Sequence, residues 1–336
     1  MLNGIIAVSP HFGIVKWLWL INGFSLSVLW PSLIRLCSES LAKRDLTRSS
    51  IAIGTTVASG TLVIYGLSAL YAVFNVFKLS FYTAAAADFA VAMVWLFTYD
   101  KAVSGARQLK AQEYTEAIQS NAKAQTVEEI GNLRMIRTLV AFLCVFAVGI
   151  NLIKDGLNTW VPSVLKEAYG LPASISILLT LCLPMIAICG NAFALRVHKR
   201  IPDYVSQCAG TFAITGCIVM GILWSLNSRQ VAVMLGGLAL SSLLVSSLNS
   251  LVTSIFPMFM RNFVNSGMMA GVINGFCYLG STISSYGLGF IADRKGWSAV
   301  FWTLLAFCVL ACVLWGVYMI IRRTSSRLQK NGLVTQ

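Results

Sequence analysis

The chain has 336 residues, of which 57% are hydrophobic and only 11% are charged, and its mean hydropathy is +0.77. A soluble domain carries roughly a quarter charged residues, so the composition excludes an ordinary soluble protein and favours an integral membrane protein. The net charge of +13 would suggest nucleic-acid binding in a soluble protein. Here the basic residues lie in short loops between apolar runs, where membrane topology explains them. We therefore expect the lipid bilayer, and no nucleic acid, as a partner.

Apolar runs of 20 or more residues recur along the chain. About 20 helical residues cross the roughly 30 Å of bilayer hydrocarbon, and the runs do not alternate apolar with polar residues as a membrane β-barrel would. We predict an all-α membrane protein with a short apolar stub at about 4–15 and nine transmembrane helices. These cover residues 16–36, 49–74, 79–99, 137–161, 173–197, 205–226, 231–260, 266–292 and 298–321.

The loops predict the orientation and the domains. With the C-terminus in the cytoplasm, 18 of the 25 basic residues lie inside, and the exceptions are Lys16, Lys78, Lys154, Lys166, Arg229, Arg294 and Lys295. Such a bias is typical of cytoplasmic loops. We predict a multi-pass protein of the plasma membrane. Its parts are a remainder of an N-terminal helix bundle, a cytoplasmic central loop, a C-terminal six-helix bundle and a cytoplasmic tail, at residues 1–99, 100–136, 137–321 and 322–336.

A short internal repeat relates the first and seventh spans. Each ends on an aromatic residue, a proline and, four residues after the proline, an arginine: Pro31 and Arg35, then Pro257 and Arg261. Repeated halves are a common plan of secondary transporters. Because three full spans precede Pro257 in its half, the repeat predicts that about 90 residues, or nearly three helices, are absent before Pro31. We therefore expect a fragment of a six-plus-six protein that does not transport on its own.

The fourth span carries a polar stripe of Asn151, Lys154, Asp155 and Asn158. The spacing i, i+3, i+4, i+7 puts these residues on one helix face. A charge inside a membrane costs several kcal/mol unless it meets a cavity or a partner. Lys154 at a water-filled cavity would attract a phosphate or a carboxylate. The alternative is that Lys154 only extends its ammonium towards the outer interface.

Polar residues also mark the seventh and eighth spans. Asn274 and Tyr278, with Ser281 and Ser285, follow one face of the eighth span, and Asn249 belongs to a similar face of the seventh with Ser242, Ser246 and Thr253. Asn274 and Tyr278 either line a cavity or join helices by hydrogen bonds, and we interpret the serines mainly as packing residues. We also expect the Gly271-xxx-Gly275 pair in the eighth span to mark close helix packing.

Two carboxylates are candidates for coupling, Asp155 and Asp88, the latter midway along the third span. A buried carboxyl group can carry a proton, and the alternative for Asp88 is a neutral, hydrogen-bonded structural acid. The nine cysteines are scattered without a CxxC pair, and the two histidines lie far apart, so we expect no metal site and no cofactor. No nucleophile–base pair or phosphate-binding loop indicates an enzyme.

Three stretches carry a resemblance to a known family. The run from Leu20 to Pro31 resembles the fourth helix of organophosphate:phosphate antiporters, a group within the major facilitator superfamily. The stretch 154–162, Lys-Asp-Gly-Leu-Asn-Thr-Trp-Val-Pro, is similar to their seventh helix, and 270–280 with 292–297 is similar to their eleventh. The resemblance covers the whole chain as family helices four to twelve of twelve.

The resemblance implies a secondary transporter, a monomer, that works by alternating access. It implies a small anionic solute, such as a sugar phosphate or glycerol phosphate, held where the family has an arginine and this chain has Lys154. Asn151, Asn158, Asn274 and Tyr278 would line the cavity. Two alternatives remain: a transporter-like sensor that binds the solute without moving it, and a non-functional remnant of a truncated gene.

Overall fold

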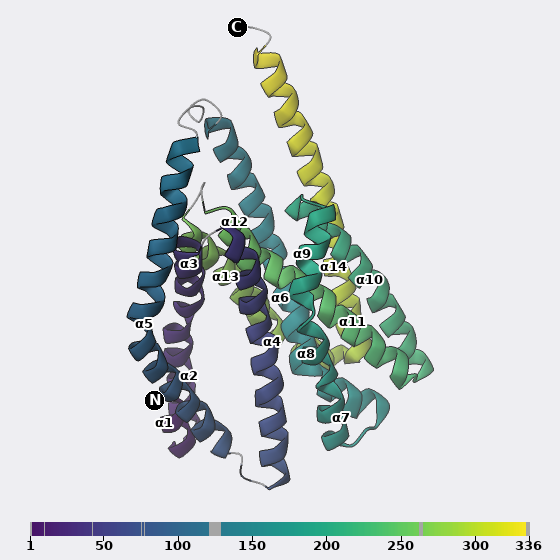
Figure 1. Cartoon of the computed structure of the whole chain (residues 1–336). Helices are drawn as coiled ribbons and strands as arrows, with labels where there is room; N and C mark the ends of the chain where they lie inside the picture. Colours follow the sequence, from purple (N-terminus) through teal and green to yellow (C-terminus); the bar gives the residue numbers. More distant parts are fainter. Residues whose placement is uncertain are drawn as a thin grey trace. The chain divides into compact units, whose positions relative to one another are not determined.

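A computed structural model describes residues 2–9, 11–41, 43–74, 76, 78–120, 129–261 and 265–333 of the chain. The regular secondary structure of these residues is entirely helical (Figure 1). Contacts divide the chain into two compact units. The first unit joins Met1–Lys123 to Pro257–Gly271, and the second unit joins Ala124–Phe256 to Val272–Gln336. Each unit is described by itself below.

In the first unit, apolar runs become long helices with few interruptions. The predicted span 16–36 is divided at Val28, shortly before Pro31, because proline has no backbone N–H to continue the helical hydrogen bonds. Residues 121–128 of the predicted central loop lie outside the described residues. The helices are α1 (Leu2–Val8), α2 (Phe12–Ser27), α3 (Leu29–Ser40), α4 (Lys43–Val73) and α5 (Lys78–Ser120).

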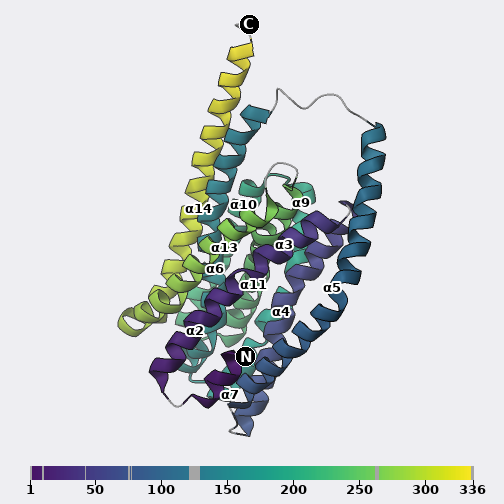
Figure 2. The same ribbon diagram turned by 90° about the vertical axis from the view of Figure 1, so that its left-hand side faces the viewer.

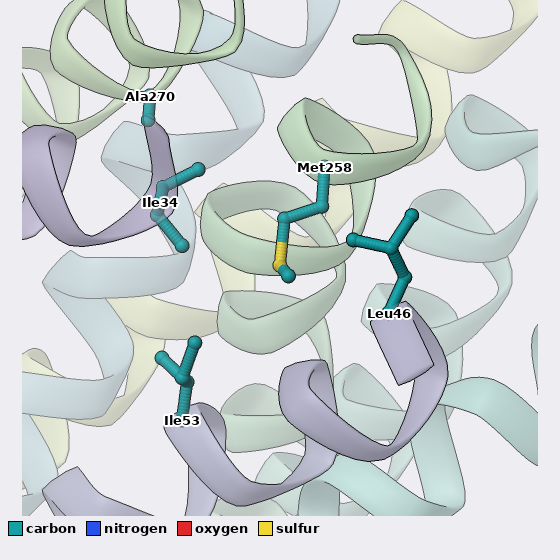
Figure 3. Close-up of a cluster of buried hydrophobic side chains, with 5 residues drawn as sticks. All are labelled: Ile34, Leu46, Ile53, Met258 and Ala270. Atoms are coloured by element: carbon teal, nitrogen blue, oxygen red, sulfur yellow. The ribbon is translucent and has the colours of Figure 1, made fainter. Parts of the chain in front are cut away.

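A small hydrophobic core holds the first unit together. Ile34 of α3, Leu46 and Ile53 of α4, Met258 of α12 (Phe256–Phe259) and Ala270 of α13 (Ser266–Thr282) point towards one another (Figure 3). Met258 and Ala270 are far from the other three in sequence, and both are fully buried. The segment 257–271 is therefore a structural part of the first unit.

Arg261 reinforces this segment with polar contacts. Its Nη1 donates to the carbonyl oxygens of Ser38, at 2.9 Å, and Leu41, at 2.7 Å. These carbonyls lie at the C-terminal end of α3, where a helix has no partners of its own for its last carbonyl groups. The Ser38 and Ser266 hydroxyls are also hydrogen-bonded. A cation at a helix C-terminus also interacts favourably with the helix dipole.

The second unit contains more breaks than the sequence predicts. The predicted span 173–197 becomes three short helices, which meet near Leu181 and Cys189 on either side of Pro184. Two π-helical turns, η1 and η2, interrupt the seventh and eighth predicted spans. The elements are α6 (Glu129–Tyr169), α7 (Ala173–Thr180), α8 (Cys182–Ala187), α9 (Gly190–Arg200), α10 (Tyr204–Ser228), α11 (Val231–Ser250), η1 (Leu251–Ile255), the later part of α13, η2 (Ile283–Leu288) and α14 (Gly289–Leu333).

Eight helical stretches of the described residues are long and apolar enough to cross a membrane. The last, Ser266–Thr324, has 59 residues and contains the eighth and ninth predicted spans. It turns at Gly296, whose φ of 77° lies in the region that favours glycine; the turn is visible near the start of α14 in Figure 2. The prediction of an all-helical membrane protein is confirmed.

α13 packs closely on α6 at Gly280. A Cβ atom at Gly280 would lie 2.2 Å from the Val148 carbonyl oxygen, too close for any side chain. At Gly275 no described atom lies within 4 Å of the corresponding position, and at Gly271 the nearest is Pro31 Cγ at 3.6 Å. Gly271 is thus at an ordinary packing distance from Pro31, and the predicted Gly271-xxx-Gly275 packing pair is wrong at Gly275. Which glycine is in contact depends on how the helices approach one another, and the sequence does not show this.

Candidate functional site

The polar stripe of α6 forms the centre of the candidate site. Lys154 Nζ donates to Asn151 Oδ1 at 2.9 Å, as the i, i+3 spacing on a helix allows. The same Nζ lies 3.5 Å from Asp155 Oδ1. Asn158, one turn beyond Lys154, is half-buried on the same helix. The structure thus brings three of the four predicted stripe residues into direct contact.

Two neighbouring helices extend this contact into a continuous polar chain. Asn151 Nδ2 donates to Asn249 Oδ1 of α11 at 3.3 Å, and the Ser281 hydroxyl of α13 donates to Asp155 Oδ2. The chain Asn249–Asn151–Lys154–Asp155–Ser281, called here the polar chain, joins α11, α6 and α13. Asn249 and Ser281 were predicted to lie on polar helix faces, but nothing in the sequence indicated these partners.

The buried end of the polar chain is fully satisfied. Asn151 is 3% exposed, and its second amide hydrogen goes to the Ala147 carbonyl oxygen at 3.2 Å. Because both of its N–H donors are used, its Oδ1 is held in place to accept from Lys154. Buried polar groups that find all their partners fix one geometry. Asn151 therefore positions the ammonium.

The charged end of the polar chain is partly accessible. The Lys154 and Asp155 side chains are 19% and 29% exposed, so neither charge is sealed from solvent. An ammonium has three donors. Among the described residues, Asn151 and Asp155 are its partners, which leaves one donor for a further acceptor. The 3.5 Å separation from Asp155 is longer than a charge-assisted hydrogen bond of 2.7–2.9 Å, so the ionic partner is held loosely.

Both π-helical turns lie next to the polar chain. η1 begins two residues after Asn249, and η2 begins two residues after Ser281. π-helical turns are often found at functional sites. Trp160 of α6 donates from Nε1 to the Ser284 carbonyl oxygen within η2, at 3.2 Å. This indole links the C-terminal part of α6 to the π-helical part of the eighth predicted span.

The remaining predicted site residues lie outside these contacts. Tyr278 is 52% exposed on α13, and Asn274, one turn earlier, is half-buried. Asp88 is an exposed residue of α5 in the first unit, where its Oδ2 accepts from Asn3 Nδ2 of α1 at 3.2 Å. Their roles in binding or coupling stay predictions.

A cavity of about 150 Å³ in the second unit is separate from the polar chain. Its lining is almost entirely apolar and includes Phe146, Gly149, Phe212, Phe276 and Phe307. Such a lining gives no group that recognises a charge. The polar chain offers the charged and polar groups that the lining of this cavity lacks.

Comparisons with known proteins identify the family. The family model described as the Major Facilitator Superfamily matches residues 1–266. A search of curated protein sequences found no match. Among solved structures, a bacterial homologue of the iron transporter ferroportin, in an outward-facing state with soaked iron, is 14% identical with a TM-score of 0.43, over 95% of this chain and 92% of that one. Because the family match covers most of the chain, the protein belongs to the major facilitator superfamily, and it is a multi-pass secondary transporter of a solute and not an enzyme.

Proposed function

We propose that the protein carries a small organic anion across the membrane by alternating access and that Lys154 holds the anion. The observation that carries the proposal is the ammonium within a membrane-spanning helix, which is 2.9 Å from a fixed amide oxygen but 3.5 Å from its carboxylate partner. A charge in a span is costly and marks a solute pathway or a structural pair. The loose contact with Asp155 favours the first of these.

The same geometry supports a phosphate or carboxylate group on the solute. Lysine acts as a compact point charge that binds either group without a preferred plane. The resemblance of residues 154–162 to the seventh helix of organophosphate:phosphate antiporters favours a phosphate ester, such as glycerol phosphate or a sugar phosphate. Asn158, Asn274 and Tyr278 would then bind the hydroxyl groups of the ester.

Uptake into proteoliposomes tests this function. We expect the protein expressed from its whole gene to take up labelled glycerol 3-phosphate with saturation, and other phosphate esters to compete where neutral glycerol does not. Protein-free vesicles are the control. Binding without uptake would indicate a sensor. Uptake that glycerol inhibits as well as glycerol 3-phosphate would contradict an anion site.

We also propose that the 100–136 region and the C-terminus face the cytoplasm, because 18 of the 25 basic residues then lie inside. In a background without the native cysteines, Gln112→Cys should resist an impermeant thiol reagent in intact cells and react after permeabilisation. Gln230→Cys, at the opposite end of the predicted spans, is the matched control and should react in intact cells. The reverse pattern would overturn the orientation.

A further inference from the structure

The two charges of the polar chain are each held by a different neutral partner. The Lys154 ammonium donates to Asn151 Oδ1 at 2.9 Å, and Asp155 Oδ2 accepts from the Ser281 hydroxyl of α13. Between the charges, Nζ and Asp155 Oδ1 stay 3.5 Å apart, beyond the length of a charge-assisted hydrogen bond. Asn151 thus holds the ammonium from one side, and Ser281 holds the carboxylate from the other.

Close packing on both sides fixes the position of Ser281 against α6. One residue earlier, a Cβ atom at Gly280 would lie 2.2 Å from the Val148 carbonyl oxygen. One turn later, η2 meets α6 at Gly156, where a Cβ atom would lie 3.0 Å from Ser284 Oγ. Because the backbone of α13 and η2 touches α6 before and after Ser281, its hydroxyl cannot follow the carboxylate if that group turns towards the ammonium.

The Ser281 hydroxyl has a reason to donate to the carboxylate. Its oxygen also lies 3.1 Å from the Cys277 carbonyl oxygen, but a hydroxyl has one hydrogen to donate. A hydrogen bond to a charged acceptor is roughly twice as strong as one to a neutral acceptor. The hydrogen therefore goes to Asp155 Oδ2, and the carboxylate stays drawn towards α13.

The position of the carboxylate decides how much of the ammonium an anion can use. Without the hydroxyl, Asp155 would lose its contact with α13 and could close on Lys154 as a direct ion pair. A solute anion would then have to displace the carboxylate before it could bind. With the hydroxyl present, the ammonium keeps a donor for the solute, and Asp155 remains hydrogen-bonded and 29% exposed beside it.

We propose that Ser281 is a positioning residue of the anion site, which keeps Asp155 from closing on the Lys154 ammonium. This inference rests on the proposed function of Lys154. It assigns to Ser281 an effect on affinity that acts through Asp155 and needs no contact between the serine and the solute.

A double-mutant cycle on Ser281 and Asp155 tests this role. The binding of glycerol 3-phosphate is measured at one pH on the purified protein expressed from its whole gene. Loss of one hydrogen bond predicts that Ser281→Ala binds about three- to tenfold more weakly than the wild type. Asp155→Asn should bind at least as tightly as the wild type. In that background Ser281→Ala should cause no further loss, because a neutral amide does not neutralise the ammonium wherever it lies.

Thr282→Val is the matched control on the next residue. Thr282 is exposed, and its hydroxyl donates to the Tyr278 carbonyl oxygen at 2.8 Å, as a hydroxyl on a helix commonly does. Valine removes this hydroxyl and keeps the shape of the side chain. The variant should bind glycerol 3-phosphate with the affinity of the wild type.

The outcomes separate this inference from the proposed function. Wild-type affinity in Ser281→Ala, or an equal loss with and without Asp155→Asn, would reduce Ser281 to a packing residue and overturn the inference. Weaker binding by Asp155→Asn than by the wild type would also overturn it, even if Ser281→Ala does not fold. In each of these cases the anion site at Lys154 would stand. Absence of binding by the wild type would instead overturn the proposed function.

Discussion

Replacement of Lys154 by alanine should weaken the binding of glycerol 3-phosphate about ten- to a hundredfold in the purified protein. The reason is that hydrogen bonds to charged groups contribute roughly 1.5–3 kcal/mol, and each 1.4 kcal/mol corresponds to a factor of ten in affinity. Lys154→Arg keeps the charge and should retain part of the binding. The guanidinium is larger than the ammonium that Asn151 holds at 2.9 Å, so full affinity is not expected.

The matched control for this experiment is Lys166→Ala. Lys166 lies in the last turn of α6 and is exposed, so its loss removes the same charge from the same helix without touching the polar chain. The affinity of the Lys166→Ala variant for glycerol 3-phosphate should equal that of the wild type. If Lys154 were only structural, Lys154→Ala would lower expression, and the folded protein that remained would bind as well as the wild type. That result would remove the main support for an organic-anion substrate.

The second large effect is expected at Gly280, where alanine should destabilise the protein by about 1–3 kcal/mol. The added Cβ would lie 2.2 Å from the Val148 carbonyl oxygen and 3.0 Å from Val148 Cα. These are backbone atoms, so α6 and α13 must move apart. Gly280 precedes Ser281, and such a movement would also lengthen the Ser281–Asp155 contact. A loss of stability of this size lowers the thermal midpoint by several degrees, about 2–4 °C per kcal/mol.

Gly275→Ala is the matched control on the same helix. Apart from the backbone of its own helix, no described atom lies within 4 Å of its Cβ position, and alanine is the better helix former by about 1 kcal/mol. This variant should melt at or above the wild-type temperature. Unfolding can be followed with a thiol-reactive dye, because the buried Cys208 and Cys277 become accessible only on unfolding. If Gly280→Ala melts as high as Gly275→Ala, the close approach of α6 and α13 is not as described.

Local sequence patterns predicted the helices and the shared face of the α6 polar stripe, because both depend on spacing along one element. The polar stripe of α6 follows from the helical period, and the Asn151–Lys154 contact follows from i, i+3 geometry. The membrane-spanning segments follow from the length of the apolar runs. These features need no knowledge of the neighbouring helices.

Contacts between elements could not be predicted from the sequence. Asn249 and Ser281 are 98 and 126 residues from their partners in the polar chain, and many other polar residues in the spans were equally available. The break of the predicted span 173–197 near Pro184 could have been predicted from the sequence, because proline interrupts helical hydrogen bonds. No residue pattern indicated the π-helical turns, since a turn with one extra residue depends on the packing around it.

The contacts of Arg261 have a consequence for the order in which the chain assembles during synthesis. The Ser38 and Leu41 carbonyls, at the end of α3, receive their donor from a residue made 223 and 220 positions later. At about 5–20 residues per second, the ribosome needs roughly 10–45 s to supply it. During this interval α3 and α4 lack Met258 and Ala270 as well, so their shared core is incomplete. α3 and α4 thus reach their final packing only after residue 270 has been made, and they depend on water, lipid or the insertion machinery until then.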